Sequence, residues 1–402
     1  MTRWDRALIR RVARVGSGHT PSRSRTDYWS GERTIPWLTT GDVFKLRDGR
    51  RSVLSETEEM ITAEGLANSS ATIHPTGTVA MSRTASVGFT CIMGRPMATS
   101  QDWVTWTCGD RILPKFLLWG IRGDMSRVLS RMKGSTHQTI YMDELRELSV
   151  PLPPLEEQQH VADFLDMETE RIDMLIAGYA HQIELVEEEL KSSLSSTVDD
   201  LSEIWPHRKL GHVATICEGQ VDPRNPPYSE MILIAPNHIE RGTGQLGALE
   251  TASEQGAISG KYLCARGDVI YSKIRPHLAK AAIAPVDCLT SADMYPLRCT
   301  PEIEPGYLAL YLLSERFTSE AVLNSERVAM PKINRERLLR MRLPLPSLCV
   351  QREVTEAISL HQDSSRRVVK ELESQIRHLS EYRQALITLA VTEGVEACKA
   401  VT

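Results

Sequence analysis

The sequence has few of the features that mark disulfide-bonded, zinc-binding or membrane-spanning proteins. Its 402 residues include eight cysteines, but none forms a C-x-x-C pair and their spacing is irregular. This excludes a zinc ribbon and a disulfide framework, and it indicates reduced thiols. No stretch approaches the roughly 20 unbroken apolar residues of a membrane span. The first residues, MTRWD, lack the apolar core of a signal peptide. We therefore expect a cytoplasmic protein.

Motifs of common catalytic sites are also missing. The chain has no G-x-x-x-x-G-K-[ST] phosphate loop, no G-x-S-x-G nucleophile turn and no H-E-x-x-H metal motif. Its eleven histidines are dispersed along the sequence. The residues therefore predict a binding protein with no catalytic residues, no metal site and no cofactor of its own.

One short motif points towards catalysis, but its context does not support it. Asn225–Tyr228 spells NPPY, a signature of adenine amino-methyltransferases, which hold a base flipped out of the duplex. In those enzymes the motif follows a hydrophobic strand and a separate glycine-rich cofactor loop. Here it follows a polar turn, Gly219–Arg224, and the nearest glycine-rich candidate is the lone G-x-G of Gly16–Gly18. The sequence argues against methyltransferase chemistry in this chain.

The most informative feature is a long internal repeat. Leu145–Leu165 and Leu338–Ile358 align without a gap and share the frame Leu-x₅-Pro-Leu-Pro-x-Leu-x₂-Gln-x₂-Val, which includes Gln158 and Gln351. The distance between the copies far exceeds the roughly 20–50 residues of a solenoid unit. It predicts a duplication of a domain plus a helix, which would present two similar surfaces.

Each copy of the repeat leads into a long amphipathic stretch. Glu156 to Val198 contains no proline and a single glycine, and its apolar residues recur at intervals of three and four. Val350 to Val391 repeats the pattern. A stripe this narrow is typical of a coiled coil, so we expect two long helices that bury their stripes against each other. An ordinary bundle core without further function is the alternative.

The charge is divided unevenly among four segments. Residues 1–150 carry 21 basic and 15 acidic side chains, whereas residues 151–205 carry 2 and 14. Residues 206–343 and 344–402 are close to neutral, and the whole chain has a formal charge of −5. The mildly basic first segment favours a polyanion as partner, whereas the acidic segment 151–205 is expected to face solvent or protein.

The repeat extends into the two β-rich segments. Gly77–Arg83 parallels Gly267–Lys273, and Thr99–Asp102 parallels Thr290–Asp293. In both copies a predicted strand leads into a serine and then a cation at the start of a loop. A single such cation would be read as a solvated loop residue, but two copies favour a contact with phosphate or base.

With these motifs, the chain resembles the specificity (S) subunit of type I restriction-modification systems over nearly its whole length. The resemblance rests first on the duplicated Pro-Leu-Pro…Gln frame and its long helices. It rests next on an opening of the form G-x-T-P-S…Y-W…I-P-W-x-T-x-x-D, spanning Gly18–Asp42. The third element is the pair of loops Met81–Gly88 and Tyr271–Pro276.

The resemblance implies an α+β fold with two α/β target-recognition domains, 1–150 and 206–343. Two long antiparallel helices, 151–205 and 344–402, would separate them. Each domain would read one half of a bipartite DNA target. The helices would dock two methylating (M) subunits, which bind S-adenosylmethionine, and motor-nuclease (R) subunits would complete the enzyme. The NPPY tetrapeptide would then fall in a variable loop.

The resemblance also supplies candidate contact residues. The predicted DNA-binding residues are Thr39, Thr40, Ser82, Arg83, Ser100, Gln101, Asn237, His238, Ser272, Lys273 and Arg275. The predicted partner-binding residues are Gln158, Ile172, Ile183, Gln351, Leu372 and Ile376.

Three other functions stay open at this point. A solitary methylating or nicking enzyme would need a cofactor loop, and binding of S-adenosylmethionine by the isolated chain would support it. A coiled-coil adaptor unrelated to DNA would leave the twin serine-cation loops unexplained. A specificity subunit of a system that methylates DNA without restricting it would differ only in lacking a neighbouring motor-nuclease gene, which the chain itself does not reveal. The sequence does not predict the DNA target either.

Overall fold

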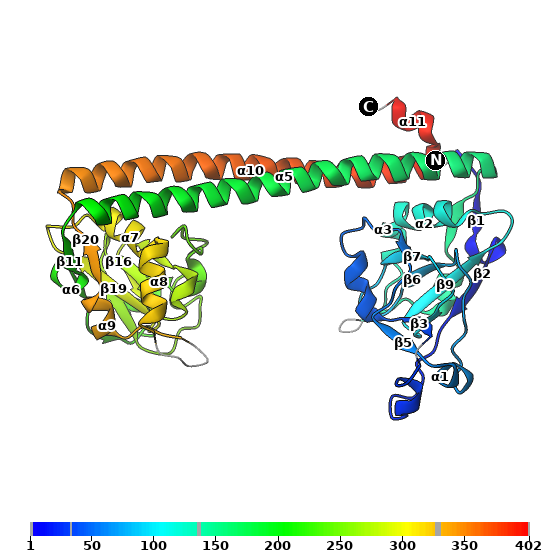
Figure 1. Ribbon diagram of the computed structural model, residues 1–402, viewed down its shortest axis with the longest axis horizontal. Coiled ribbons are helices and arrows are strands. Elements are labelled where there is room, and N and C mark those ends of the chain that lie inside the picture. The colour runs from blue at the N-terminus through cyan, green and yellow to red at the C-terminus, as the bar shows by residue number, and fades with distance from the viewer. Residues whose placement is uncertain (1–2, 33, 135–137, 326–330, 401–402) are drawn as a thin grey trace. The chain divides into compact units, whose positions relative to one another are not determined.

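The computed structural model describes residues 3–32, 34–134, 138–325 and 331–400, and the chain forms two compact units. Unit 1 consists of residues 1–180 and 373–402, and unit 2 consists of residues 181–372. Two long helices, α5 (Leu155–Ile204) and α10 (Leu348–Glu393), each contribute one part to either unit (Figure 1). In the described ranges, no helix is long and apolar enough to span a membrane.

Unit 1 is built on two mixed sheets. A five-stranded sheet has the order β2 (Ala13–Ser17), β9 (Trp103–Cys108), β6 (Val79–Ser82), β7 (Thr90–Met93), β4 (Val53–Leu54). A three-stranded sheet has the order β5 (Glu59–Ile61), β3 (Ile35–Leu38), β8 (Ala98–Thr99), and β1 (Arg6–Leu8) pairs with β10 (Ser149–Pro151). Helix α2 (Pro114–Gly123) begins with proline at its first turn and buries Phe116 to Ile121 in the core beside β7 and β6.

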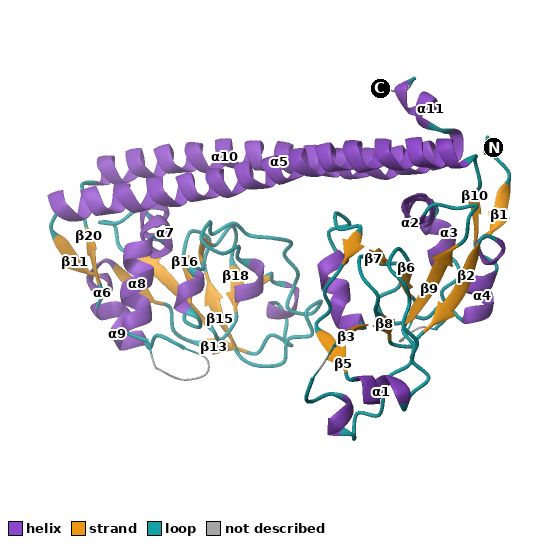
Figure 2. Cartoon of the chain, turned by 45° about the vertical axis from the view of Figure 1, so that its right-hand side comes forward, coloured by secondary structure: helices purple, strands orange, loops and turns teal. Residues whose placement is uncertain are grey.

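Unit 2 repeats this plan. One sheet has the order β12 (Ala214–Ile216), β19 (Met294–Cys299), β16 (Val269–Ser272), β17 (Ala281–Ile283). The other has the order β13 (Gln220–Val221), β15 (Lys261–Cys264), β18 (Cys288–Thr290), β14 (Leu233–Ile234), and β11 (His207–Lys209) pairs with β20 (Arg342–Pro344). Helix α7 (Pro305–Leu313) takes the place of α2. The short helices α8 (Glu315–Leu323) and α9 (Arg335–Arg340) follow it (Figure 2).

The internal repeat of the sequence is therefore a repeat of topology. The order β2-β9-β6-β7 in unit 1 corresponds to β12-β19-β16-β17 in unit 2, and both sets pair antiparallel. In both units a short strand just before a long helix closes an antiparallel pair with the strand that opens the domain. This confirms the predicted mixed α and β architecture with two similar domains and two long helices.

The two long helices share a core within each unit. In unit 1, Leu165 and Ile172 of α5 belong to the same buried cluster as Leu386 and Ala390 of α10. Asp173 pairs with Arg383 there, and α5 begins beside the end of α10, so the two segments run antiparallel. In unit 2 the end of α5 and the start of α10 join another core, through Leu194, Val198, Leu201 and Ile358. The observed helices extend slightly beyond the predicted 156–198 and 350–391.

Two apolar runs that the sequence predicts to be strands, Val87–Met93 and Glu230–Ala235, form shorter strands in the structure. The strand expected over Val87–Met93 begins only at Thr90, because Gly88 has a φ of 96° and its N–H binds the Ser82 carbonyl at 2.9 Å. The strand expected over Glu230–Ala235 is reduced to Leu233–Ile234, since a 3₁₀ turn occupies Tyr228–Glu230. The NPPY tetrapeptide lies in the exposed loop that leads into this turn.

Buried His74 makes the stability of unit 1 depend on pH. Its ring is 6% exposed, and its Nδ1 lies 3.4 Å from the Thr105 hydroxyl. Burial lowers the pKa of His74 below its usual 6.5, with a smaller contribution from the charge of Arg14. Below pH 6.5 the unfolded chain therefore binds a proton that the folded chain does not, so the free energy of unfolding should fall as the pH drops. Hydrogen exchange of unit 1 amides at pH 7.5 and pH 5.5 measures this, and His74→Gln should flatten the slope. An equal slope in both proteins would exclude His74 as its source.

Candidate nucleic-acid interface

Six of the predicted DNA-binding residues converge at one edge of unit 1. Strands β3 and β8 run parallel and end side by side, with Leu38 opposite Thr99. The residues that follow these ends are Thr39 and Thr40 on one strand and Ser100 and Gln101 on the other. The loop that starts with Ser82 and Arg83 joins them, because the Arg83 N–H binds the Asp102 carbonyl at 2.8 Å. We call Thr39, Thr40, Ser82, Arg83, Ser100 and Gln101 edge 1.

Half of edge 1 is buried and fixes the loops. The Thr39 side chain caps the 3₁₀ helix η3 (Thr40–Leu46) by accepting the Gly41 N–H at 3.0 Å. The Ser82 hydroxyl donates to the Ser86 carbonyl and accepts the Phe89 N–H at 3.1 Å. The Ser100 hydroxyl accepts the Asp102 N–H at 3.2 Å. These three hydroxyls hold the backbone of edge 1, and all three residues are buried.

The exposed side of edge 1 consists of Thr40, Gln101 and the half-exposed Arg83. The Arg83 guanidinium donates to the carbonyls of Gln101 at 2.9 Å and Ile140 at 3.4 Å. The side-chain amide oxygen of Gln101 accepts the Thr20 hydroxyl at 2.6 Å. Arg83 has five N–H donors, so these two bonds leave further donors for a ligand.

A buried carboxylate holds the backbone next to edge 1 in place. Asp42 is completely buried, and its oxygens accept the N–H groups of Thr39 at 3.0 Å and Glu58 at 2.8 Å. It also forms an ion pair with Lys45 at 2.9 Å. Asp42 thus fixes the backbone at which β3 passes into η3.

The other five predicted DNA-binding residues converge in unit 2. Strands β14 and β18 are parallel, with Ile234 opposite Thr290, and Asn237 and His238 follow the end of β14. The loop of Ser272, Lys273 and Arg275 joins them, because the Lys273 N–H binds the Asp293 carbonyl at 3.0 Å. We call Asn237, His238, Ser272, Lys273 and Arg275 edge 2.

Among the described residues, edge 2 presents more positive charge without an ion-pair partner than edge 1. Ser272 is buried, with its hydroxyl donating to the Ile274 carbonyl at 3.1 Å. The Nδ1 of His238 accepts the Ala235 N–H at 3.0 Å. The Lys273 ammonium lies 5.6 Å from the centre of the Tyr295 ring. The exposed Arg275 guanidinium has no hydrogen-bond or ion-pair partner in the described part of the chain.

The two loops share an unusual backbone conformation. Ala85 has a φ of 61° and Arg275 a φ of 47°, values that non-glycine residues rarely adopt. Both are fixed in the same way: the Ala85 N–H binds the Gln138 carbonyl at 3.0 Å, and the Arg275 N–H binds the Pro331 carbonyl at 2.7 Å. The same framework therefore presents alanine in unit 1 and arginine in unit 2.

Sequence reasoning missed the segments that complete the edges. Thr20 lies in the opening G-x-T-P-S motif, which gave no indication that its hydroxyl binds Gln101. Gln138 lies far from the repeated motifs, and no spacing signal points to it. Ala85 could have been found, because it aligns with Arg275 when the register of the repeated loops is continued past Arg83 and Lys273.

Of the residues predicted to bind partner subunits, the two glutamines act as internal clamps: each holds backbone segments of its own unit together through hydrogen bonds. Gln158 and Gln351 are completely buried. Gln158 accepts the Leu113 N–H at 2.9 Å and donates to the carbonyls of Arg111 and Pro153 at 3.0 and 2.9 Å. Gln351 makes the matching bonds to Glu304, Glu302 and Pro346 at 2.8, 3.0 and 2.9 Å. Neither side chain is accessible to a partner in this structure.

The predicted apolar contacts are also largely turned inward. Ile172 is in the core of unit 1, and Ile183, Leu372 and Ile376 are half-buried. Other apolar side chains of the long helices are exposed instead, including Leu175 and Val368, which recur with the periodicity that predicted the buried stripes. They are Met167, Met174, Leu175 and Leu185 on α5, and Leu360 and Val368 on α10.

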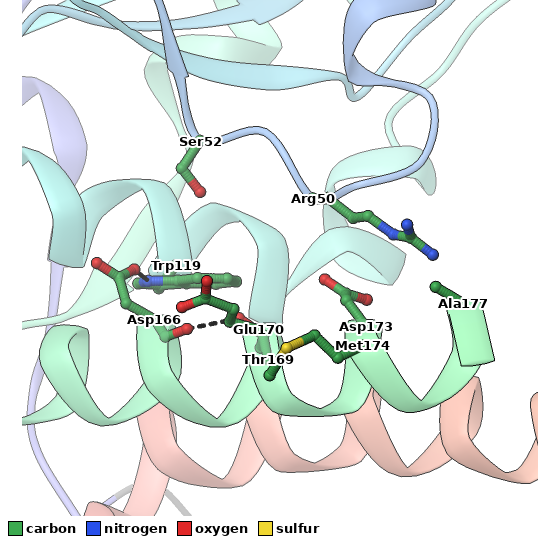
Figure 3. Close-up of a pocket in the computed structure, with 9 residues that line it drawn as sticks. All are labelled: Arg50, Ser52, Trp119, Asp166, Thr169, Glu170, Asp173, Met174 and Ala177. Carbon is green, nitrogen blue, oxygen red and sulfur yellow. Dashed lines mark hydrogen bonds between the residues drawn. The ribbon is translucent and has the colours of Figure 1, made fainter.

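A cavity of about 390 Å³ lies in unit 1 where the chain before β4 approaches α5 (Figure 3). Three α5 carboxylates line it together with Trp119 and Arg50. Asp166 accepts the Trp119 indole N–H at 2.9 Å and pairs with Lys115 at 2.6 Å. Asp173 pairs with Arg383 at 3.1 Å. Among the described residues, no group of three or more His, Cys, Asp or Glu side chains is placed to hold a metal ion.

The family model and the most similar known proteins all point to the same kind of protein. The model of the type I restriction modification DNA specificity domain matches residues 1–184 and 203–377. The type I restriction enzyme EcoDI specificity subunit of Escherichia coli is 25% identical over 403 residues, covering 90% of this chain and 89% of that protein. The MjaIX specificity subunit of Methanocaldococcus jannaschii is 28% identical over 262 residues, covering 60% of this chain and 59% of that protein.

Solved structures share the fold over almost the whole length. A chain from a type I R-M system, studied for its complex assembly and conformational transition, superposes with a TM-score of 0.73 at 16% identity, covering 98% of both chains. The HsdS subunit from Thermoanaerobacter tengcongensis gives a TM-score of 0.55 at 17% identity, covering 98% of this chain and 97% of that one.

Proposed function

Because the chain belongs to the family of type I restriction-modification DNA specificity domains, matched twice along its length, we propose that edge 1 and edge 2 each read one half of a bipartite DNA target. The chain is a DNA-specificity subunit without catalytic function, and catalysis lies in partner subunits. The paired construction of the two edges carries the proposal: the same strand ends, loops and positive-φ positions recur in both units.

The partners are part of the same proposal. Methylating subunits, which would bind S-adenosylmethionine, are proposed to dock on the exposed apolar side chains of α5 and α10, such as Met174 and Leu360. Exposed apolar residues on otherwise polar helices are typical of protein contacts. Motor-nuclease subunits are proposed to join the assembly in the cytoplasm.

The exposed chemistry differs between the two edges. Edge 2 presents Arg275, which is exposed and has no side-chain partner among the described residues, and arginine binds guanine O6 and N7 through two hydrogen bonds in the major groove. Edge 1 presents Thr40 and Gln101, and glutamine pairs with adenine N6 and N7. We therefore propose that a guanine lies opposite Arg275 in the half-site of unit 2. In unit 1 an uncharged side chain, Ala85, stands at the equivalent position.

The proposal predicts a base-specific effect of Arg275. Arg275→Ala should weaken recognition by about 1–3 kcal/mol at a single base pair of one half-site, leaving the other half-site unchanged. Lys273→Ala and Arg83→Ala, if they contact phosphate, should weaken binding to all sequences uniformly. The measurement is the methylated motif in cells that carry each variant with its partner subunits. Arg266→Ala, which removes an exposed cation on another turn of unit 2, serves as control. A motif identical to the wild type in the Arg275 variant would refute the assignment.

A further inference from the structure

An arginine-rich turn leads away from edge 1. Helix η3 starts at Thr40, and the chain after it carries Arg47, Arg50 and Arg51, all exposed. In the parts of the chain that the structure describes, no ion pair or side-chain hydrogen bond engages any of these three guanidinium groups. We call residues 47–51 the basic turn.

Two further arginines hold the backbone of the basic turn from the core side. The Arg122 guanidinium donates to the carbonyls of Gly49 at 3.2 Å and Arg51 at 2.9 Å. Arg383 donates to the same Gly49 carbonyl at 3.0 Å. The turn is thus fixed in place, and five guanidinium groups gather around it.

The positive charge around the turn is incompletely neutralised. Asp173 is paired with Arg383, and Asp48 lies exposed within the turn, where it accepts the Arg50 N–H. Burial, together with the charge of Arg383, lowers the pKa of Arg122 to about 10. Burial is the larger cause of this shift, and the smaller contribution of Arg383 reflects the close approach of two positive charges beside the turn.

The cavity beside α5 accounts for only part of this charge. Arg50 reaches the rim of that cavity (Figure 3), but Arg47 and Arg51 do not line it. Two of its three carboxylates are already paired, Asp166 with Lys115 and Asp173 with Arg383. The acidic face of α5 therefore leaves most of the turn unpaired.

Unit 2 has no counterpart of the basic turn. The stretch that follows His238, residues 239–260, carries a single arginine, Arg241, and three glutamates, Glu240, Glu250 and Glu254. The arginines are therefore not a requirement of the shared fold, and they point to a function of unit 1 alone.

We propose that the basic turn binds the sugar-phosphate backbone of DNA beside the half-site read by edge 1, adding affinity that does not depend on sequence. This rests on the proposed function of edge 1. The seven residues of η3 rise by about 2 Å each, so the turn begins about 14 Å from Thr40. A duplex carries a phosphate on each strand about every 3.4 Å, so DNA that extends from edge 1 along η3 would bring phosphates to the turn. Continuity with edge 1 favours DNA over an acidic protein.

The test is the salt dependence of binding to DNA of random sequence. The full-length chain, assembled with its methylating subunits, is titrated against a labelled random-sequence duplex between about 50 and 200 mM KCl. R47A/R50A/R51A should make the slope of log K against log [salt] shallower by about 2 to 3, since each lost phosphate contact removes about 0.9. R47A/R51A, which leaves Arg50 at the cavity, should still reduce it by about 2.

A control variant with the same net charge separates a local contact from a general effect. R10A/R127A/R146A removes three arginines that lie in ion pairs elsewhere in unit 1. It should leave the slope unchanged. Equal losses in both triple variants would overturn the proposal, and so would an unchanged slope with poorer co-purification of the methylating subunits, which would identify an acidic protein as the ligand.

Mapping methylation in cells distinguishes this proposal from the function on which it rests. The triple variant of the basic turn should methylate the wild-type motif to a lower extent, and a change in the motif would overturn the assignment to phosphate. Absence of any bipartite motif with the wild-type complex would refute the proposed function. A wild-type bipartite motif together with an unchanged salt slope would refute only the role of the basic turn.

Discussion

Replacing Gln158 with leucine is expected to destabilise unit 1 by about 3 kcal/mol, because each of three hydrogen bonds contributes about 1 kcal/mol and leucine offers their backbone partners no substitute. The lost partners are the Leu113 N–H and the carbonyls of Arg111 and Pro153. Gln351→Leu should cost unit 2 about as much, since its three bonds match in type and length. Hydrogen exchange under increasing denaturant reports the free energy of opening for each unit separately.

The neighbouring glutamine supplies the control. Gln159 is exposed and binds only the Asp163 carboxylate, one helical turn away, so Gln159→Leu should change stability by less than about 0.5 kcal/mol. If Gln158→Leu were as mild as Gln159→Leu, or if Gln351→Leu lowered the protection of unit 1, the clamps would not have the local role assigned to them.

Asp42→Ala is the second substitution with a large expected effect. It removes a fully buried carboxylate that accepts two backbone N–H groups and pairs with Lys45. Breaking a buried pair by removing one partner typically costs about 3–5 kcal/mol. We expect unit 1 to lose stability on this scale, measured by chemical denaturation. Methylation directed by edge 1 should be lost with it, because Thr39 and Thr40 depend on Asp42 for their position.

Asp48→Ala tests whether this effect is specific to the buried carboxylate. Asp48 is exposed on the basic turn, and its side chain accepts one hydrogen bond, from the Arg50 N–H. Its removal should change stability by less than about 0.5 kcal/mol. A comparable loss in both variants would mean that negative charge near edge 1, rather than the buried network of Asp42, controls its stability.

The overall architecture was predictable because the internal repeat and the helical periodicity of the apolar residues can be seen in the sequence. The Pro-Leu-Pro frame, the two amphipathic stretches and the paralleled strands at 77–83 and 267–273 each appear in the structure as expected. Helix starts were nearly correct, since proline precedes each long helix and stops the preceding element, whereas α5 continues to Ile204, beyond the predicted Val198. Short strands such as β14 were overestimated, because β propensity in an apolar run does not reveal where a 3₁₀ turn begins.

The candidate site was predictable in location but not in detail. The repeated loops identified both edges, and the structure brings their residues together. A sequence cannot say which hydroxyl is used internally, so Ser82 and Ser272 were predicted in the same terms as the exposed Arg275. The same limit applies to the helices. Gln158 and Gln351 share a place in the repeat frame, and both bind the backbone just before a following helix. The repeat alone does not distinguish such an internal contact from a docking residue.

The composition of the two units has a consequence for the order in which the protein folds during synthesis. Unit 2 is a continuous segment, whereas unit 1 needs both ends of the chain. Its core includes Leu386, Ala390, Val395 and Cys398, and the Arg3 N–H binds the Thr392 carbonyl at 3.0 Å. Domains commonly fold from the N-terminus as the chain leaves the ribosome. In this chain, unit 1 is therefore the first domain to be synthesised and the last to be completed. Part of its apolar core surface stays exposed until the final helical turns have been synthesised.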